Sequence, residues 1–272
     1  MSFLENAFIE TAVKTTLSKK GVTGKSVQKN VNLKTDVRPE YKKCFSDEDL
    51  HKLESYFWKP GDLFMYLMKK NIKFSLSFIA GIVLLFVFGI GLLVLGYTAY
   101  LFYKEWMNLP TDEEFDALKK KAFKTLDTIS LEKLGLDKSD TVRNNEVVSG
   151  PKYTDGIYKV GKDGYVRYRS YWILVSNFTK KQLATYKCSL DLVTGQRYSE
   201  STDEFFYKDI VSVGTKENDD GWTNFELRNS GGGNIEIPLF SDNFSNEIGG
   251  KFEATDADKV INNIRAIVRG NK

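Results

Sequence analysis

The distribution of apolar residues divides this chain at one stretch, residues 74–103, which contains no charged side chain. Lys73 and Lys104 bracket the stretch. About 20 apolar residues already span a bilayer core of roughly 30 Å, so the run predicts a membrane segment. We favour one tilted helix, because no Pro, Asn or Asp marks a turn. The alternative is a short hairpin folded near Gly89 and Gly91, and glycines in the run allow close helix packing.

Before this stretch, the pattern predicts a basic region of helices and linkers, residues 1–73. Apolar residues recur close to every fourth position in residues 2–18, which is typical of a short amphipathic helix. Residues 19–43 contain several lysines and few apolar residues. They are either a basic arm attracted to anionic lipids or a solvated linker. Ser46, an N-cap followed by three acidic residues, predicts a helix that Pro60 ends.

Both ends of the apolar run carry the aromatic and basic residues that favour a lipid headgroup layer. Residues 62–73 are apolar and then basic, which is typical of a helix lying along the membrane surface. Lipids are therefore one predicted partner. The predicted membrane-surface residues are Trp58, Lys69, Lys70, Lys73, Lys104 and Trp106.

After the run, residues 104–145 predict a juxtamembrane helix and a linker. Thr111 and Glu114 form a capping box just after Pro110, and Gly135 is a typical helix C-terminal residue. One face of this helix is apolar. It is either a stalk that self-associates or a brace against the domain that follows.

In residues 146–272 the apolar period changes to two, which indicates β-strands. Residues 165–175 and 204–215 each predict a strand, and residues 225–239 predict a hairpin. A helix capped at Thr255 carries an apolar stripe that can close a bent antiparallel sheet. The predicted fold class is therefore an α+β membrane protein with a C-terminal β-roll closed by an amphipathic helix.

The C-terminal sequence also resembles a known family. The run EFFYKDIVSVGT, the hairpin FELRNSGGGNIEIPLF and the helix DADKVINNIRAIV resemble bacterial pleckstrin-homology-like (PH-like) domains. Together with PTDEEFD and LEKLGLD, they resemble a group of bacterial membrane proteins of unknown function. The resemblance covers roughly residues 110–268. It implies a PH-like roll on a membrane anchor, and it implies no catalytic residues.

The charge distribution restricts the partners. The net charge is +3, and residues 1–73 carry 14 Lys and Arg against 9 Asp and Glu. Residues 146–272 are nearly neutral, which argues against nucleic-acid binding. The basic N-terminal region favours a cytoplasmic N-terminus at the cell membrane. A single span then places the C-terminal domain outside, whereas a hairpin keeps it in the cytoplasm.

Candidate catalytic or metal chemistry is sparse. His51 is the only histidine, and the two cysteines, Cys44 and Cys188, have no metal-ligand spacing. We expect His51 on the surface and Cys188 buried on the apolar face of a strand. We therefore predict no enzyme activity, no cofactor and no metal site.

The remaining hypotheses concern binding. Lys180 and Lys181 in a turn, with Arg167 and Arg169 on a strand, form a weak candidate site for anionic lipid headgroups. The leading hypothesis is a membrane-anchored scaffold or sensor whose PH-like domain binds a protein partner or self-associates. The alternative is an oligomeric pore-forming or membrane-perturbing protein regulated by its soluble domain.

Overall fold

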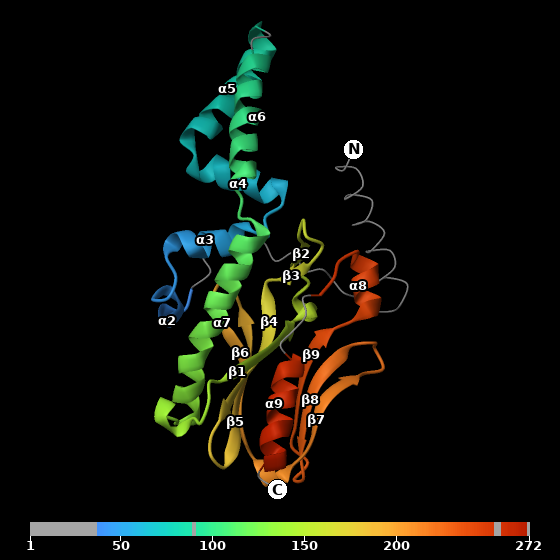
Figure 1. Cartoon of the computed structure of the whole chain (residues 1–272). Helices are drawn as coiled ribbons and strands as arrows, with labels where there is room; N and C mark the ends of the chain where they lie inside the picture. The colour runs from blue at the N-terminus through green and yellow to red at the C-terminus, as the bar shows by residue number, and fades with distance from the viewer. Residues whose placement is uncertain (1–36, 89–90, 253–256, 271–272) are drawn as a thin grey trace. The chain divides into compact units, whose positions relative to one another are not determined.

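The computed structural model describes residues 37–88, 91–252 and 257–270, which belong to one compact unit, Asp36–Lys272. The predicted helix in residues 2–18, most of the basic arm and the predicted cap at Thr255 lie outside the described residues. The fold is α+β (Figure 1). Its helices are α2 (Pro39–Lys42), α3 (Asp47–Ser55), α4 (Pro60–Lys70), α5 (Ile72–Phe88), α6 (Gly91–Met107), α7 (Asp112–Leu134), α8 (Asp242–Ile248) and α9 (Ala257–Gly270). Its strands are β1 (Glu146–Pro151), β2 (Tyr158–Val160), β3 (Val166–Tyr168), β4 (Ser170–Phe178), β5 (Gln182–Asp191), β6 (Arg197–Phe206), β7 (Ile210–Glu217), β8 (Thr223–Asn229) and β9 (Asn234–Phe240).

The apolar run is two helices, α5 and α6, of 17 residues each. They pack against each other in antiparallel orientation, because Thr98 contacts Ser77 at one end and Gly91 lies against Leu85 at the other. The backbones come so close that a Cβ atom at Gly91 would lie 2.2 Å from the carbonyl oxygen of Gly81. Glycine is therefore needed at this crossing.

This arrangement corrects the prediction for residues 74–103. Over the part of the chain that the structure describes, no helix is both long enough and apolar enough to cross a membrane. The predicted transmembrane helix, and with it the assignment to the transmembrane proteins, is wrong. The physical reason is length, since 17 helical residues extend only about 25 Å.

Two antiparallel sheets form the C-terminal part of the chain. The larger sheet has the strand order β1-β4-β5-β6 and the smaller has the order β7-β8-β9, while β2 and β3 form a separate hairpin. The predicted hairpin in residues 225–239 is confirmed as β8 and β9. Helix α9 packs on the apolar cluster enclosed by both sheets, through Val260, Ile261 and Ile264.

Two predicted strands are interrupted in the structure. Residues 165–175 contain β3 and most of β4, with Arg169 between them. Residues 204–215 contain the end of β6, a 3-10 turn (Tyr207–Asp209) and most of β7. The turn moves the chain from the larger sheet to the smaller one, so one run of alternating residues serves two sheets.

Helix α7 is a brace. Its apolar face, which includes Phe115, Leu118 and Ala122, packs in one cluster with β4, β5 and α3. Because this cluster covers the outer face of the larger sheet, β4 is buried on both faces. The predicted caps are also confirmed: Thr111 and Glu114 cap α7 reciprocally, and Gly135 ends it at φ 64°.

Candidate functional site

The open end of the α5–α6 pair carries the predicted membrane-surface residues. Leu63 and Leu67 of α4 pack with Phe74 of α5, and the half-buried Trp58 and Trp106 join this cluster. The ammonium groups around it face solvent, on Lys69, Lys70, Lys73 and Lys104. The structure therefore brings all six predicted residues to one end of the helix pair.

Helices α5 and α6, which together we call the apolar hairpin, expose large hydrophobic side chains on their outer faces. Leu93 is 78% exposed and Ile72 is 72% exposed. The other exposed members are Leu76, Ile79, Ile82, Val83, Leu85, Leu92, Tyr97, Tyr100, Tyr103 and Met107. A contiguous apolar surface of this kind marks an interaction site.

The hydroxyl groups of the hairpin form hydrogen bonds within it and with α4. Thr98 donates to the Ser77 hydroxyl at 2.8 Å, and Ser75 donates to the carbonyl oxygen of Met68 at 2.6 Å. These bonds satisfy polar groups that would otherwise be costly to bury. The three hydroxyls thus stabilise the helix pair and the connection to α4.

The four candidate anion-binding residues are not brought together. Arg169 precedes β4, whereas Lys180 and Lys181 follow it, so the nine-residue length of β4 separates them. At about 3.3 Å per residue, that separation is roughly 30 Å. No single phosphate can therefore contact both ends of this set.

Both arginines are also occupied by carboxylates. Arg167 is buried and binds Asp116 and Asp163, in each case at 2.6 Å from Nη2. Arg169 binds Asp191 at 2.9 Å. Hydrogen bonds from Arg167 hold the pKa of Asp163 well below its usual range. These pairs connect elements of the fold, and of the four candidates only Lys180 and Lys181, adjacent in the turn after β4, are exposed.

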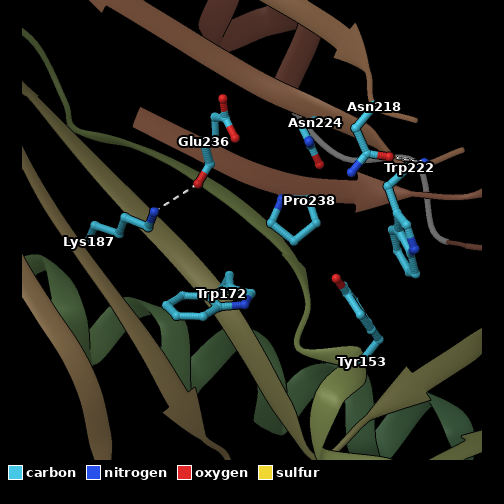
Figure 2. Close-up of a pocket in the computed structure, with 8 residues that line it drawn as sticks. All are labelled: Tyr153, Trp172, Lys187, Asn218, Trp222, Asn224, Glu236 and Pro238. Carbon is cyan, nitrogen blue, oxygen red and sulfur yellow. Dashed lines mark hydrogen bonds between the residues drawn. The ribbon is translucent and has the colours of Figure 1, made fainter. Parts of the chain in front are cut away.

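A cleft of about 300 Å³ lies between the two sheets, and no pattern in the sequence predicted it (Figure 2). One side is formed by Trp172 of β4 and Tyr153, and the other by Asn224 and Glu236. The residues that complete the lining are Lys187, Asn218, Trp222 and Pro238. The lining comes from five separate segments, so no local motif in the sequence marks it.

The aromatic residues of the cleft are held firmly. Tyr153 and Trp222 stack with ring centroids 4.5 Å apart, and Phe244 and Phe252 pack behind Trp222. The backbone amide of Trp222 donates to the Asn218 side chain at 2.8 Å, which fixes the turn that presents the ring. The aromatic surfaces are therefore preorganised.

The polar groups of the cleft carry both signs of charge. The ammonium of Lys187 donates to the carbonyl oxygen of Glu236 at 2.9 Å and lies 5.4 Å from the Trp172 ring centroid. Burial lowers the pKa of Lys187. The Glu236 carboxylate accepts from Asn234 at 2.8 Å through one oxygen.

The residues considered for chemistry have structural contacts. His51 is half-buried rather than on the surface, with Nε2 3.0 Å from the Tyr66 hydroxyl and Trp58 beside its ring. Cys188 is buried, as predicted, and burial raises its pKa to about 11. Within the described ranges, no group of three or more His, Cys, Asp or Glu residues is arranged to hold a metal ion.

Comparison with known proteins adds no relative, because no family model, curated protein or solved structure gives a significant match.

Proposed function

We propose that this protein is a non-enzymatic binding module held at a membrane surface by the apolar hairpin. The hairpin enters the lipid from one side and returns to the same side. The C-terminal domain, which we propose to be PH-like, then binds a protein partner or a second copy of the chain next to the membrane.

The observation that carries this proposal is the outer surface of α5 and α6, which is uncharged between Lys73 and Lys104. Large apolar side chains are exposed along both helices, from Ile72 to Leu85 and from Leu92 to Met107. Each Å² of apolar surface removed from water contributes about 25 cal/mol, so covering these side chains is strongly favourable. Lipid acyl chains provide such a cover without any specific partner.

The charge distribution supports entry without crossing. The lysines lie at the open end of the hairpin, on α4 and at the outer ends of α5 and α6. The opposite end, near Leu85 and Gly91, has no charged residue that a second headgroup layer would accommodate. Each helix is also shorter, at about 25 Å, than the roughly 30 Å of a bilayer core.

The basic open end favours an anionic membrane. Lys69, Lys70, Lys73 and Lys104 are exposed, and each lysine near an anionic surface contributes about 1 kcal/mol. Because a hairpin returns to its own side, the basic N-terminal region and the C-terminal domain share one compartment. The positive-inside rule favours the cytoplasmic face of the cell membrane for both.

A binding role is supported by the buried charged groups, which hold the fold together. The charged network of Arg167, Asp116 and Asp163 joins α7 to the β-strands, and the Tyr56 hydroxyl donates to Asp112 at 2.7 Å beside it. These groups stabilise the attachment of the brace to the domain. Such a connection suits a module that must present a rigid surface beside its membrane attachment.

Vesicle flotation of the full chain tests the proposal. We expect binding to phosphatidylcholine vesicles and tighter binding when phosphatidylglycerol is added. Leu93→Asp should weaken binding about a hundredfold, because a carboxylate deep in lipid costs about 2.5–3.5 kcal/mol. Val211→Asp is the matched control, because Val211 is 62% exposed on β7, outside the hairpin.

Flotation of the two variants, light scattering and a dye-release assay separate the alternatives. Equal flotation of the two variants would contradict attachment through the hairpin. Light scattering that shows a stable oligomer without vesicle binding would mean that a second copy covers the apolar surface. Escape of a trapped dye from the vesicles would favour the pore-forming alternative.

A further inference from the structure

We propose that the cleft between the two sheets binds a neutral saccharide. This inference goes beyond membrane attachment and does not depend on it. Aromatic and polar groups suited to a sugar line the cleft, and neighbouring residues disfavour a charged ligand or an added strand.

The aromatic groups suit a sugar ring. Trp172 is half-buried on β4, and Tyr153 is 42% exposed, so each presents ring surface to the cleft. Figure 2 shows both residues on the same side of Pro238. An apolar ring face can pack against the C–H groups of a pyranose, as against any flat apolar surface. Because Trp222 and its aromatic neighbours hold Tyr153 in place, little ordering is needed on binding.

The polar groups suit hydroxyls. The Lys187 ammonium has three donors, and the structure assigns one of them to the Glu236 carbonyl oxygen. The side-chain amide of Asn224 forms no hydrogen bond with any other residue that the structure describes, and it offers both a donor and an acceptor. One oxygen of the Glu236 carboxylate adds a further acceptor.

The balance of charge argues for a neutral ligand. Lys187 would attract an anion, but the Glu236 carboxylate, which points away from the ammonium while its charge still acts on it, would repel one, and the reverse holds for a cation (Figure 2). A hydroxyl group can donate to one residue and accept from the other. A polyhydroxylated ring uses both charges without bringing a charge of its own.

An extended peptide is disfavoured at the same place. Strand addition needs free backbone donors and acceptors on the β9 edge. The Glu236 carbonyl oxygen is already bonded to Lys187, and Pro238 has no N–H. The Pro238 carbonyl lies directly against Gly150 of β1, where even a Cβ atom would not fit. An added peptide strand therefore cannot pair fully with the β9 edge where it borders the cleft.

The size of the cleft limits the ligand. A volume of about 300 Å³ is at the lower end of the range for small-molecule sites. It suits one sugar ring held between the aromatic and polar sides. Further rings of an oligosaccharide would extend into solvent.

Titration calorimetry on the full chain tests this inference. The protein is kept in a zwitterionic detergent without a sugar headgroup, so that vesicle binding plays no part. The probes are chitotriose, cellotriose and maltotriose, with inorganic phosphate and an Ala-Val heptapeptide as alternatives. We expect saturable binding of at least one trisaccharide and none of phosphate or peptide.

Two substitutions locate the site, and each has a matched control. Tyr153→Ala and Glu236→Ala should each weaken binding about three- to tenfold. Tyr198→Ala and Glu204→Ala, at similarly exposed positions on β6, should change it less than about twofold. Thermal melting establishes that all four variants fold.

The inference is overturned by three results. The first is no saturable binding of any trisaccharide. The second is binding that the Tyr153 and Glu236 substitutions leave unchanged. The third is binding of phosphate or the peptide in place of the sugars.

Discussion

The guanidinium of Arg167 holds the carboxylate of Asp116 with two parallel hydrogen bonds, from Nε at 3.0 Å and from Nη2 at 2.6 Å. The two residues are 51 positions apart, on β3 and α7. Arg167 is only 4% exposed, and Asp163 bonds its other edge. Because bidentate pairs of this kind are specific in geometry, the pair fixes the brace α7 against the β-strands.

Removing this guanidinium should destabilise the protein. Arg167→Met leaves two carboxylates without their partner. We expect the free energy of unfolding, measured in urea, to be about 2–3 kcal/mol lower. The loss is smaller than for a fully buried pair, because Asp116 and Asp163 are partly exposed. Arg269→Met, on the exposed face of α9, is the control and should change stability little. Equal stability of the two variants would contradict a structural role for the pair.

The same pair should make stability depend on acid pH. Hydrogen bonding to Arg167 lowers the pKa of Asp163. For Asp116, burial acts to raise the pKa, but Arg167 and Lys119 outweigh it and the pKa is lowered. The unfolded chain therefore binds more protons in acid, so this stability is present above about pH 4 and is lost as the pH falls further. Urea midpoints measured from pH 6 to pH 2.5 should show the decrease.

A substitution separates this contribution from general acid unfolding. Asp163→Asn removes one of the titrating carboxylates, so its stability should fall less steeply between pH 4 and pH 2.5 than that of the natural protein. Parallel curves for the two proteins would contradict the assignment to Asp163.

The two cysteines should differ in reactivity. Cys44 is exposed, whereas Cys188 is buried and burial raises its pKa to about 11. The thiolate is the reactive form, so an aromatic disulfide reagent at pH 8 should modify one thiol per folded chain and both in urea. In Cys44→Ser, no thiol should react before unfolding. Rapid reaction of Cys188 in that variant would contradict its burial.

Close packing of α5 and α6 should depend on Gly91. A Cβ atom there would lie 2.2 Å from backbone atoms of α5, whereas one at Gly96 would meet nothing within 4 Å. The Ser77 and Thr98 oxygens are 2.8 Å apart, so cysteines at both positions should form a disulfide on oxidation. We expect Gly91→Val to reduce the disulfide yield severalfold and Gly96→Val to leave it unchanged. The same yield in both variants would argue against the glycine crossing.

Features set by neighbouring residues were predicted well. The Ser46 N-cap and the capping box of Thr111 with Glu114 each join residues three positions apart, so a short stretch of sequence contains both partners. The β8–β9 hairpin is likewise local, because its turn and its alternating apolar residues lie within one continuous run. That the residues at the open end of the apolar hairpin lie at a membrane surface stays a prediction.

Features set by distant residues were not predicted. The sequence does not indicate that Arg167 meets Asp116, so it suggested a free cation where the structure has a buried pair. The cleft was missed because Trp172, Lys187 and Glu236 become neighbours only when two sheets meet. The burial of both faces of β4 depends on α7, which precedes it by tens of residues.

By itself, then, the sequence of this protein determines where helices begin, where strands alternate and where the uncharged run lies, because these depend on contacts between near neighbours. The tertiary structure decided that the run divides into two packed helices, that the arginines are paired, and that the sheets enclose a cleft. Those outcomes depend on which distant surfaces bury one another, and no short segment carries that information.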